Sequence, residues 1–316
     1  MTMAARRPPR ARRHSPWLFY LFAGPWWIGF LALTAGPLIY AFWLSFKSYD
    51  GLSGRSRSVG WDNYSNALND PKVWAAIMRT GTFVAVVVPA VTIASLLVAL
   101  LLNRKRRGVS VFRTIFYLPS ILPVVASALM FKQLFDRDTG LMNAIFERLG
   151  LDRVFWLTGS TARLVLILMF LWALGAGMLI FLAALQDIPS EMVEAAQLDG
   201  AGSVRRFFSI TVPMVSPTIF FMIVVNLIFA SQVLIEPVLI APSTGAAGGL
   251  ANTAGVPESN RLYLVEVGSQ IFSYSRFGYA SALLWILVVI LLVLTAALLA
   301  LSRRFVYYAG VEAADL

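Results

Sequence analysis

Cysteine is absent from this sequence, and charged residues are scarce. The chain has 316 residues, one His and 13% charged side chains, against about a quarter in a typical soluble domain. The missing cysteines exclude disulfides and thiolate metal sites. The histidine, His14, lies among arginines, which indicates a solvated basic segment rather than a catalytic one. Scarce charge and a mean hydropathy of +0.74 indicate a chain that resides in a lipid bilayer.

Signatures of catalysis and of ion coupling are also missing. No GxxxxGK[ST] motif is present to cradle the phosphates of ATP. No Ser/His/Asp or His/Glu cluster occurs, so we expect no catalytic site, no metal site and no cofactor bound by the chain itself. No acid or base lies near the centre of an apolar run, where ion-coupled transporters usually need one. These absences argue against an enzyme and against a self-sufficient ion-coupled transporter.

Long apolar runs are what the sequence has in abundance. Crossing about 30 Å of hydrocarbon takes roughly 20 helical residues, and six runs free of Asp, Glu, Lys and Arg are long enough or nearly so. We therefore expect an all-α membrane protein with six transmembrane helices. They are placed near residues 18–46, 78–102, 113–135, 162–185, 212–236 and 277–301. A further uncharged run, 237–257, is rich in Gly and Pro and is predicted to be a loop outside the membrane.

The distribution of Lys and Arg predicts the orientation. These residues gather in the N-terminal tail, at 104–113, at 205–206 and at 303–304. Under the positive-inside rule these segments are cytoplasmic, so both termini are expected in the cytoplasm. The net charge of +10 then indicates topology and contact with membrane lipid, and no nucleic acid is expected as a partner. The predicted organisation is a basic cytoplasmic tail (1–16), a six-helix transmembrane domain (17–305) and a short cytoplasmic tail (306–316).

Proline interrupts several of the predicted spans. The pair in LPSILP, Pro119 and Pro123, is the densest. Each proline removes a backbone hydrogen bond and tends to kink its helix. This pair therefore predicts either a broken helix that lines a cavity or an ordinary kink in a packed helix.

One polar stretch, EAAQLDGAGSVRRFFSITVP, interrupts the apolar runs between the fourth and fifth spans. Pro189 and the acids after it suit the start of a short helix, which the glycines of DGAG end. Ser203 is predicted to cap a second short helix, which Pro213 closes as the fifth span begins. Two helices on the membrane surface suit either docking of a soluble partner or a loop that only turns the chain.

The spacing within this stretch resembles the EAA loop of binding-protein-dependent ABC importer permeases. LAALQDIPSEMVEAAQLDGAGSVRRFFSITVPMVSP is similar to the carbohydrate branch of that family, related to the maltose and glycerol-phosphate systems. FRTIFYLPSILP and the six-span layout extend the resemblance, and Val212 departs from the Leu that is common there. The loop is taken as 186–213. The positions assigned to ATPase coupling are Glu194, Ala195, Ala196, Asp199, Gly200, Ile210 and Pro213.

The resemblance implies the type I ABC importer permease fold and a defined set of partners. In that family the loop enters a cleft on a separate ATPase, which binds ATP and magnesium. An ATPase dimer, a second permease subunit and an extracytoplasmic solute-binding protein complete the importer. The expected location is the bacterial plasma (inner) membrane, as a multi-pass protein. The alternative is a secondary transporter or channel for a small polar solute.

A pathway for sugars needs amide, hydroxyl and aromatic side chains rather than charges. The fifth span offers Asn226, Ser231, Gln232 and Glu236, and the fourth offers Trp172. Gln232 and Glu236 are expected on one face of a helix, because they are four residues apart. For Asn226 and Gln232 the alternative is hydrogen bonding between helices, and for Trp172 it is packing.

Overall fold

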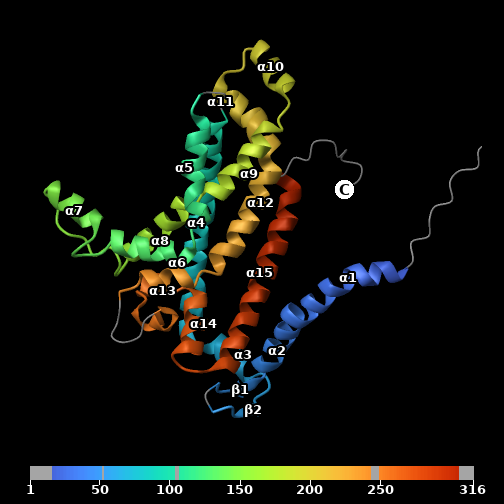
Figure 1. Ribbon diagram of the computed structural model, residues 1–316, viewed down its shortest axis with the longest axis vertical. Helices are drawn as coiled ribbons and strands as arrows, with labels where there is room; N and C mark the ends of the chain where they lie inside the picture. Colours follow the sequence, from blue (N-terminus) through green and yellow to red (C-terminus); the bar gives the residue numbers. More distant parts are fainter. Residues whose placement is uncertain (1–15, 52, 104–106, 243–248, 306–316) are drawn as a thin grey trace, which may run out of the picture.

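The structure, a computed structural model, describes residues 16–51, 53–103, 107–242 and 249–305, and these are mostly helical (Figure 1). The predicted tails therefore lie outside the described residues, apart from Pro16. The first half holds α1 (Pro16–Phe30), η1 (Leu31–Ala35), α2 (Gly36–Ser45), β1 (Lys47–Tyr49), β2 (Ser56–Ser58), α3 (Asp62–Asn69), α4 (Pro71–Leu102), α5 (Val109–Ile121), α6 (Val124–Leu134) and α7 (Leu141–Arg148). The second half holds α8 (Thr161–Trp172), α9 (Gly175–Gln186), α10 (Ser190–Leu198), α11 (Ser203–Arg206), η2 (Phe207–Thr211), α12 (Val212–Ser231), α13 (Ile235–Ile240), η3 (Gly249–Gly255), η4 (Glu258–Asn260), α14 (Tyr263–Phe272) and α15 (Phe277–Phe305).

Long apolar helices dominate the fold, as the sequence predicts. By length and composition alone, four segments could each cross a membrane: Tyr20–Ser45, Pro71–Leu102, Ser203–Ser231 and Phe277–Arg303. Two further pairs, α5 with α6 and α8 with α9, are each bent at a short break. Counting each bent pair as one span gives six. The described chain thus carries four to six candidate spans.

The third predicted span is not one straight helix. It divides into α5 and α6, which meet at 99°. Leu122 at the break is extended (ψ 138°), as expected for a residue that precedes a proline, and Pro123 follows it at the N-cap of α6. The LPSILP pair therefore breaks the helix here. The α8–α9 pair bends by a smaller 43°.

Two other prolines are accommodated by π-helical turns. η1 ends just before Gly36 and Pro37, and η2 ends just before Val212 and Pro213. A proline inside a helix lacks the N–H for the usual hydrogen bond, and its ring clashes with the carbonyl four residues earlier. The wider π turn gives room for the ring, so both helices continue.

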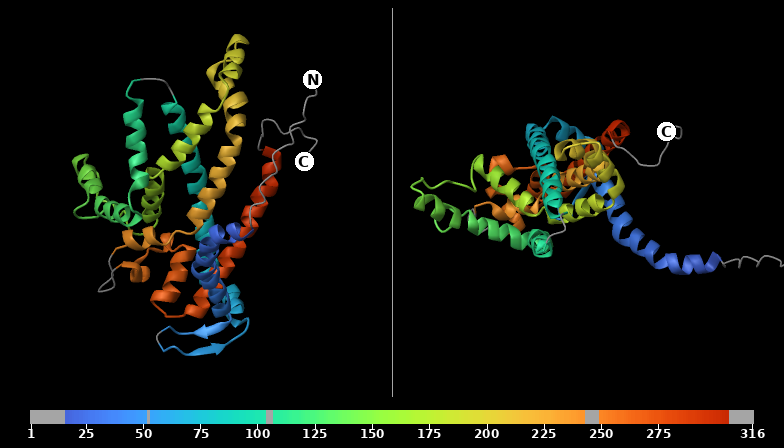
Figure 2. Two further views of the ribbon diagram at one scale, coloured as in Figure 1. Left: turned by 45° about the vertical axis from the view of Figure 1, so that its right-hand side comes forward. Right: turned by 90° about the horizontal axis from the view of Figure 1, so that it is seen from above.

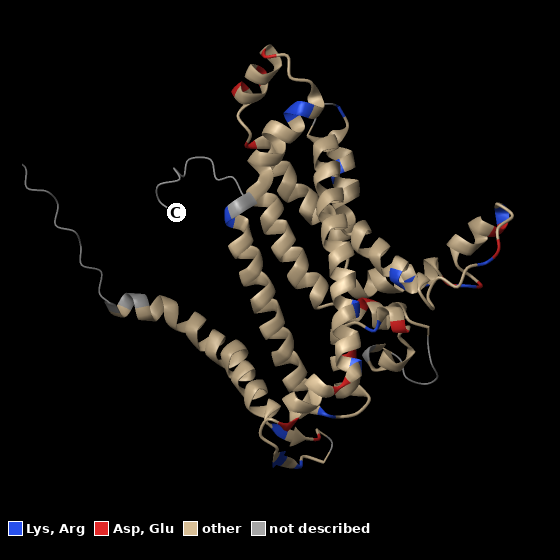
Figure 3. Ribbon diagram, turned by 180° about the vertical axis from the view of Figure 1, so that it is seen from behind, with Lys and Arg blue, Asp and Glu red and all other residues tan. Residues whose placement is uncertain are grey.

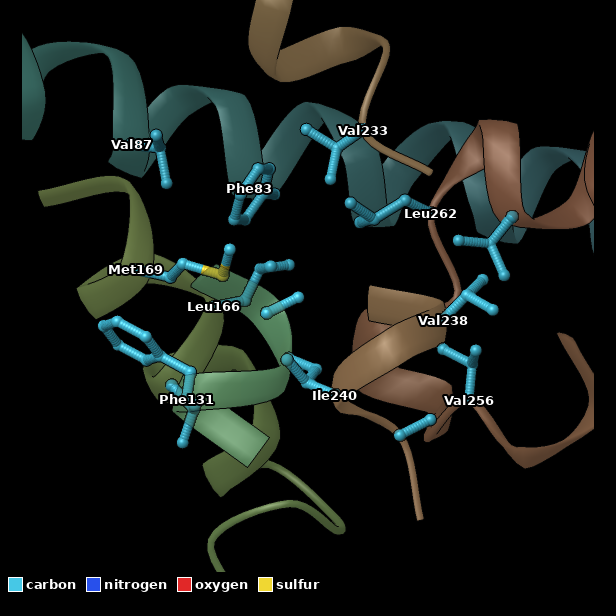
Figure 4. Packing of buried hydrophobic residues seen from close by; sticks show 14 of the residues in the cluster. Phe83, Val87, Phe131, Leu166, Met169, Val233, Val238, Ile240, Val256 and Leu262 are labelled. Atoms are coloured by element: carbon cyan, nitrogen blue, oxygen red, sulfur yellow. The ribbon is translucent and has the colours of Figure 1, made fainter. Parts of the chain in front are cut away.

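The central helix of the core is α4, which contacts α8, α9, α12 and α14. Figure 4 shows Phe83 and Val87 of α4 facing Leu166 and Met169 of α8, all within one buried cluster. Lipid tails are as apolar as these side chains, so van der Waals packing rather than removal from water stabilises such contacts inside a bilayer.

Charged residues lie mainly at the extremities of the molecule, and the two N-terminal helices differ in how they pack against it. Figure 3 shows acids on α10 and bases around the β1–β2 hairpin, while α12 carries no charge and α15 carries charge only near its C-terminal end. α2 packs against α15, whereas α1 extends away from the body of the molecule (Figure 2).

The predicted loop at 237–257 is partly helical, because it contains part of α13 and all of η3.

Candidate functional site

The EAA stretch forms a short helix at one extremity of the molecule. α10 lies at the top of Figure 1, beyond the ends of the long helices, and none of its residues is buried. Pro189 is its N-cap, and Glu191 lies in its first turn, where the helix dipole favours an acid. Glu194 and Ala195 are exposed and Ala196 is half-buried. A helix this short and exposed has little packing of its own to hold it, which suits a surface that is covered in an assembly.

Gly200 makes the turn that ends α10. Its φ of +76° lies in the left-handed region that favours glycine. The Gly200 N–H donates to the Gln197 carbonyl at 3.0 Å, and the Ala201 N–H donates to the Ala196 carbonyl at 2.9 Å. These bonds satisfy carbonyls that would otherwise be free at the helix end. Asp199 and Gly200 are both exposed at this turn.

The segment after the turn differs from the sequence prediction. Gly202, not Ser203, occupies the N-cap of α11, and no side chain caps that helix. α11, η2 and α12 form one continuous segment, Ser203–Ser231, so the predicted second surface helix is the start of the fifth span. Pro213 does not end a helix, because the π turn of η2 absorbs it. Ile210 lies within this turn, half-buried.

A cavity of about 940 Å³ separates α10 from the adjacent ends of α4, α5 and α9. Glu194 and Gln197 line it from α10, and Arg113 lines it from α5. Arg113 Nη2 donates to the Leu102 carbonyl at 3.0 Å, which ties α5 to the end of α4. α10 is thus connected to the membrane-spanning body through its two ends and has space behind it.

Apolar side chains are also exposed at the same extremity. Leu198, at the end of α10, is 90% exposed, and Val204 and Phe208 are also largely exposed. Exposed apolar side chains near the tip of α10 offer surface that a partner could cover. Their apolar character can be recognised in the sequence, whereas their exposure is a property of the fold.

The candidate pathway residue Asn226 makes a contact between helices. Its Nδ2 donates to Thr92 Oγ1 of α4 at 3.1 Å. Ser231, at the end of α12, donates to the Leu227 carbonyl of its own helix at 2.7 Å. The Asn226 bond matches the alternative that was left open for this residue, in which polar groups hold membrane helices together, whereas the Ser231 bond stays within its own helix.

Gln232 and Glu236 do not share a helix face. α12 ends at Ser231, Gln232 is its exposed C-cap with φ −107°, and α13 begins only at Ile235. The expected spacing of four residues on one helix is therefore wrong, because the break lies between the two residues. Glu236 instead lies in the first turn of α13, in a half-buried position.

Trp172 packs in the core. Its ring lies 5.5 Å from that of Phe131 in an edge-to-face arrangement, and it contacts the main hydrophobic cluster. The structure therefore does not bring the five candidate pathway residues into one group: Asn226 and Trp172 pack between helices, and Gln232 and Glu236 lie on two different elements.

On the side of the molecule remote from α10, a network of hydrogen bonds ties three segments together. Arg163 Nε of α8 donates to the Ser259 carbonyl at 3.0 Å, and its Nη1 donates to Thr82 Oγ1 of α4 at 2.9 Å. Asn260 Nδ2 donates to the Ala162 carbonyl at 2.9 Å. The segment before α14 is thus held against the ends of α4 and α8.

Comparisons with known proteins agree with this geometry. Residues 67–307, more than half of the chain, match the family model described as binding-protein-dependent transport system inner membrane component. The probable ABC transporter permease protein YesP of Bacillus subtilis is 37% identical over 98% of this chain and 97% of its own length. The arabinooligosaccharides transport system permease protein AraP of the same organism is 28% identical over 94% of this chain and 95% of its own.

A third relative and two solved structures extend the comparison. The sn-glycerol-3-phosphate transport system permease protein UgpA of Yersinia pestis is 35% identical over 71% of this chain and 76% of its own. A bacterial alginate ABC transporter in complex with alginate pentasaccharide-bound periplasmic protein has a chain that superposes with a TM-score of 0.78 at 24% identity, over 91% of this chain and 94% of that one. A bacterial ABC transporter involved in alginate import gives the same TM-score at 25% identity, over 91% and 96%.

Proposed function

Because the chain belongs to the family of binding-protein-dependent transport system inner membrane components, we propose that it is the transmembrane permease subunit of an ATP-driven sugar importer. The family match and the relatives named for arabinooligosaccharide and glycerol-3-phosphate transport support this assignment. In this proposal the chain crosses the bacterial plasma membrane six times, has both termini in the cytoplasm and forms half of the translocation pathway.

The observation that carries the proposal is the position of α10. It stands clear of the membrane-spanning helices, has no buried residue and ends at a left-handed glycine turn. The proposed role of α10 is to enter a cleft on a separate ATPase subunit and to carry its movement to α12. Glu194, Ala195, Ala196, Asp199, Gly200, Ile210 and Pro213 are the proposed coupling residues.

The proposed partners follow from what the chain lacks. Its sequence has no phosphate-cradling motif, so ATP and magnesium would bind to an ATPase dimer. A second permease would complete the pathway, and an extracytoplasmic solute-binding protein would deliver the sugar. The chain itself is proposed to have no enzymatic activity.

A pull-down of the tagged chain from its native membrane in mild detergent tests the assignment. We expect a P-loop ATPase and a second EAA-bearing permease to remain bound. Leu198→Ser should lower the recovered ATPase several-fold, because Leu198 offers exposed apolar surface at the tip of α10. Leu141→Ser is the matched control, since Leu141 is also exposed but lies on α7.

Two results would reject the proposal. One is a chain that is recovered alone and still moves solute across liposomes without ATP, which would favour a secondary transporter or channel. The other is equal recovery of the ATPase with both leucine variants, which would show that the tip of α10 does not contact the ATPase.

A further inference from the structure

A polar pocket lies at the opposite extremity of the molecule from α10. It is enclosed by the β1–β2 hairpin, α3 and the turn between α14 and α15, which gather at the bottom of Figure 1. Its volume is about 490 Å³, within the range of small-molecule sites. None of the proposed coupling or pathway residues lines it. The pocket is therefore a feature that the proposed function has not used.

The side chains that line the pocket combine flat polar groups with aromatic rings. Amides come from Asn66 and Gln270, a guanidinium from Arg276, and phenol rings from Tyr49 and Tyr274. An amide offers a donor and an acceptor in one plane, and a guanidinium offers several donors in one plane; both arrangements suit neighbouring hydroxyls. Tyrosine rings add an apolar face with a polar edge. This is the combination that a sugar ring requires, because the ring has hydroxyls around its rim and C–H groups on its faces.

The walls of the pocket are fixed by hydrogen bonds between distant segments. Asn63 Nδ2 of α3 donates to the Ser45 carbonyl at 2.8 Å and to the Lys47 carbonyl at 2.9 Å, which holds the hairpin against α3. Asp50 and Arg276 pair as an isolated antiparallel bridge, which joins the hairpin to the turn before α15. Three elements from separate parts of the sequence thus form one rigid rim, and such preorganisation favours binding.

One buried group on the wall has unused hydrogen-bonding capacity. Gln270 is only 6% exposed, and its Nε2 donates to Glu266 Oε1 at 2.9 Å. Its Oε1 is buried and has no donor among the described residues. A buried acceptor without a donor costs free energy, and native structures seldom leave one unless a ligand or water supplies the donor.

The backbone at the rim is strained. Among the described residues, Ser275 is the one non-glycine residue with a positive φ, at +55°. Strain of this kind is held in place by its surroundings and gathers at binding sites. Here the Arg276 N–H donates to the Gln270 carbonyl at 2.8 Å, which fixes the turn and directs Arg276 and Tyr274 to the pocket.

We propose that this pocket is a carbohydrate-binding subsite, away from the translocation pathway, that holds one ring of a neutral oligosaccharide on the outer face of the permease. This inference rests on the proposed function for the sugar class and for the sidedness of the pocket. The volume, the amide and tyrosine lining and the unused acceptor of Gln270 carry it. A subsite here would raise the local concentration of oligosaccharide at the outer surface of the importer.

The side chains that line the pocket favour a neutral sugar as its occupant over a cation or a side chain of a partner protein. Asp50 and Asp70 share the pocket with Arg276, whose charge opposes a cation. No group of three or more acids or histidines among the described residues could hold a metal ion. A protein side chain would leave several of the polar lining groups without partners, whereas a ring with many hydroxyls can satisfy them.

Saturation-transfer NMR on the purified importer in nanodiscs, without its binding protein, tests the proposal with maltotriose, xylotriose and arabinotriose as probes. At least one trisaccharide should give a signal. Asn66→Ala and Tyr274→Ala should each lower that signal at least five-fold, because they remove an amide and a ring from the pocket. Asn69→Ala and Phe272→Ala are the matched controls: Asn69 lies on the same helix as Asn66, Phe272 ends the helix that precedes Tyr274, and neither lines the pocket.

The outcomes separate the possibilities. Absence of signal from all three trisaccharides overturns the subsite, as does a signal that the two pocket variants leave unchanged. A loss of binding-protein docking in Asn66→Ala, without any trisaccharide signal, would assign the pocket to a protein contact instead. The proposed function would survive each of these results, because it is judged by recovery of the ATPase and the second permease.

Discussion

Gly200 is the residue of the EAA stretch whose backbone conformation a substitution would disturb most directly. A side chain at φ +76° costs about 1–2 kcal/mol, even though a Cβ there would meet no other atom within 4 Å. Gly200→Val should therefore lower transport roughly tenfold by distorting the end of α10, while membrane insertion stays normal. ATP-dependent uptake in proteoliposomes measures this. Gly202→Ala, at φ −64° and equally open, should transport normally, and equal losses in both variants would contradict the argument.

Asn226 provides a second test at the scale of residues. If its bond to Thr92 mainly holds α12 to α4, Asn226→Leu and Thr92→Val should be non-additive, with a coupling of about 0.6 kcal/mol in a stability cycle. The double variant should keep its substrate preference. Thermal unfolding in detergent and competition uptake measure the two quantities. A changed substrate preference would place Asn226 in the pathway after all.

At the scale of elements, the contact between α5 and α9 depends on a glycine. A Cβ on Gly175 would lie 2.3 Å from the Phe116 carbonyl oxygen, so Gly175→Ala must push the two helices apart. Overpacking of this kind costs about 1–3 kcal/mol, and the melting temperature should fall by several degrees. Gly81→Ala in α4, where a Cβ meets nothing within 4 Å, should be neutral or stabilising. Equal melting temperatures for the two variants would refute the close approach.

The elements also show which patterns predict structure well. The fourth and fifth predicted spans have helices close to their expected places because long uncharged runs need a helix in lipid. The third predicted span is broken at Pro123, where the sequence was compatible with either a broken helix or an ordinary kink. Prolines alone do not determine the outcome: Pro123 starts a new helix after a sharp bend, whereas Pro213 is absorbed by a π turn in a helix that continues.

At the scale of the whole molecule, the orientation is open to a direct test, because the chain has no cysteine. In a single-cysteine variant, Ser53→Cys on the hairpin should react with an impermeant maleimide in intact cells. Gln197→Cys on α10 should react only after the membrane is permeabilised. Both positions are exposed, so access rather than burial determines the labelling. Reaction of both variants in intact cells would reject the proposed topology.

The sequence by itself determined the class of the protein. Scarce charge and long apolar runs predicted a helical membrane protein, and the EAA spacing predicted the family that the comparisons then showed. These features are local in the chain: a run of 20 apolar residues or a fixed spacing of glycine and acid can be found without knowing what it contacts. The position of α10 as a separate short helix was predictable for the same reason.

Only the tertiary structure decided which side chains meet. Gln232 and Glu236 are separated by a helix break, Trp172 packs on Phe131, and the pocket beside Gln270 draws its walls from the hairpin, α3 and the turn before α15. No periodicity links these segments, since they are far apart in the chain and meet through packing and hydrogen bonds. Groupings of this kind depend on how the helices pack and bend. A local sequence pattern does not contain that information, because it describes one segment at a time.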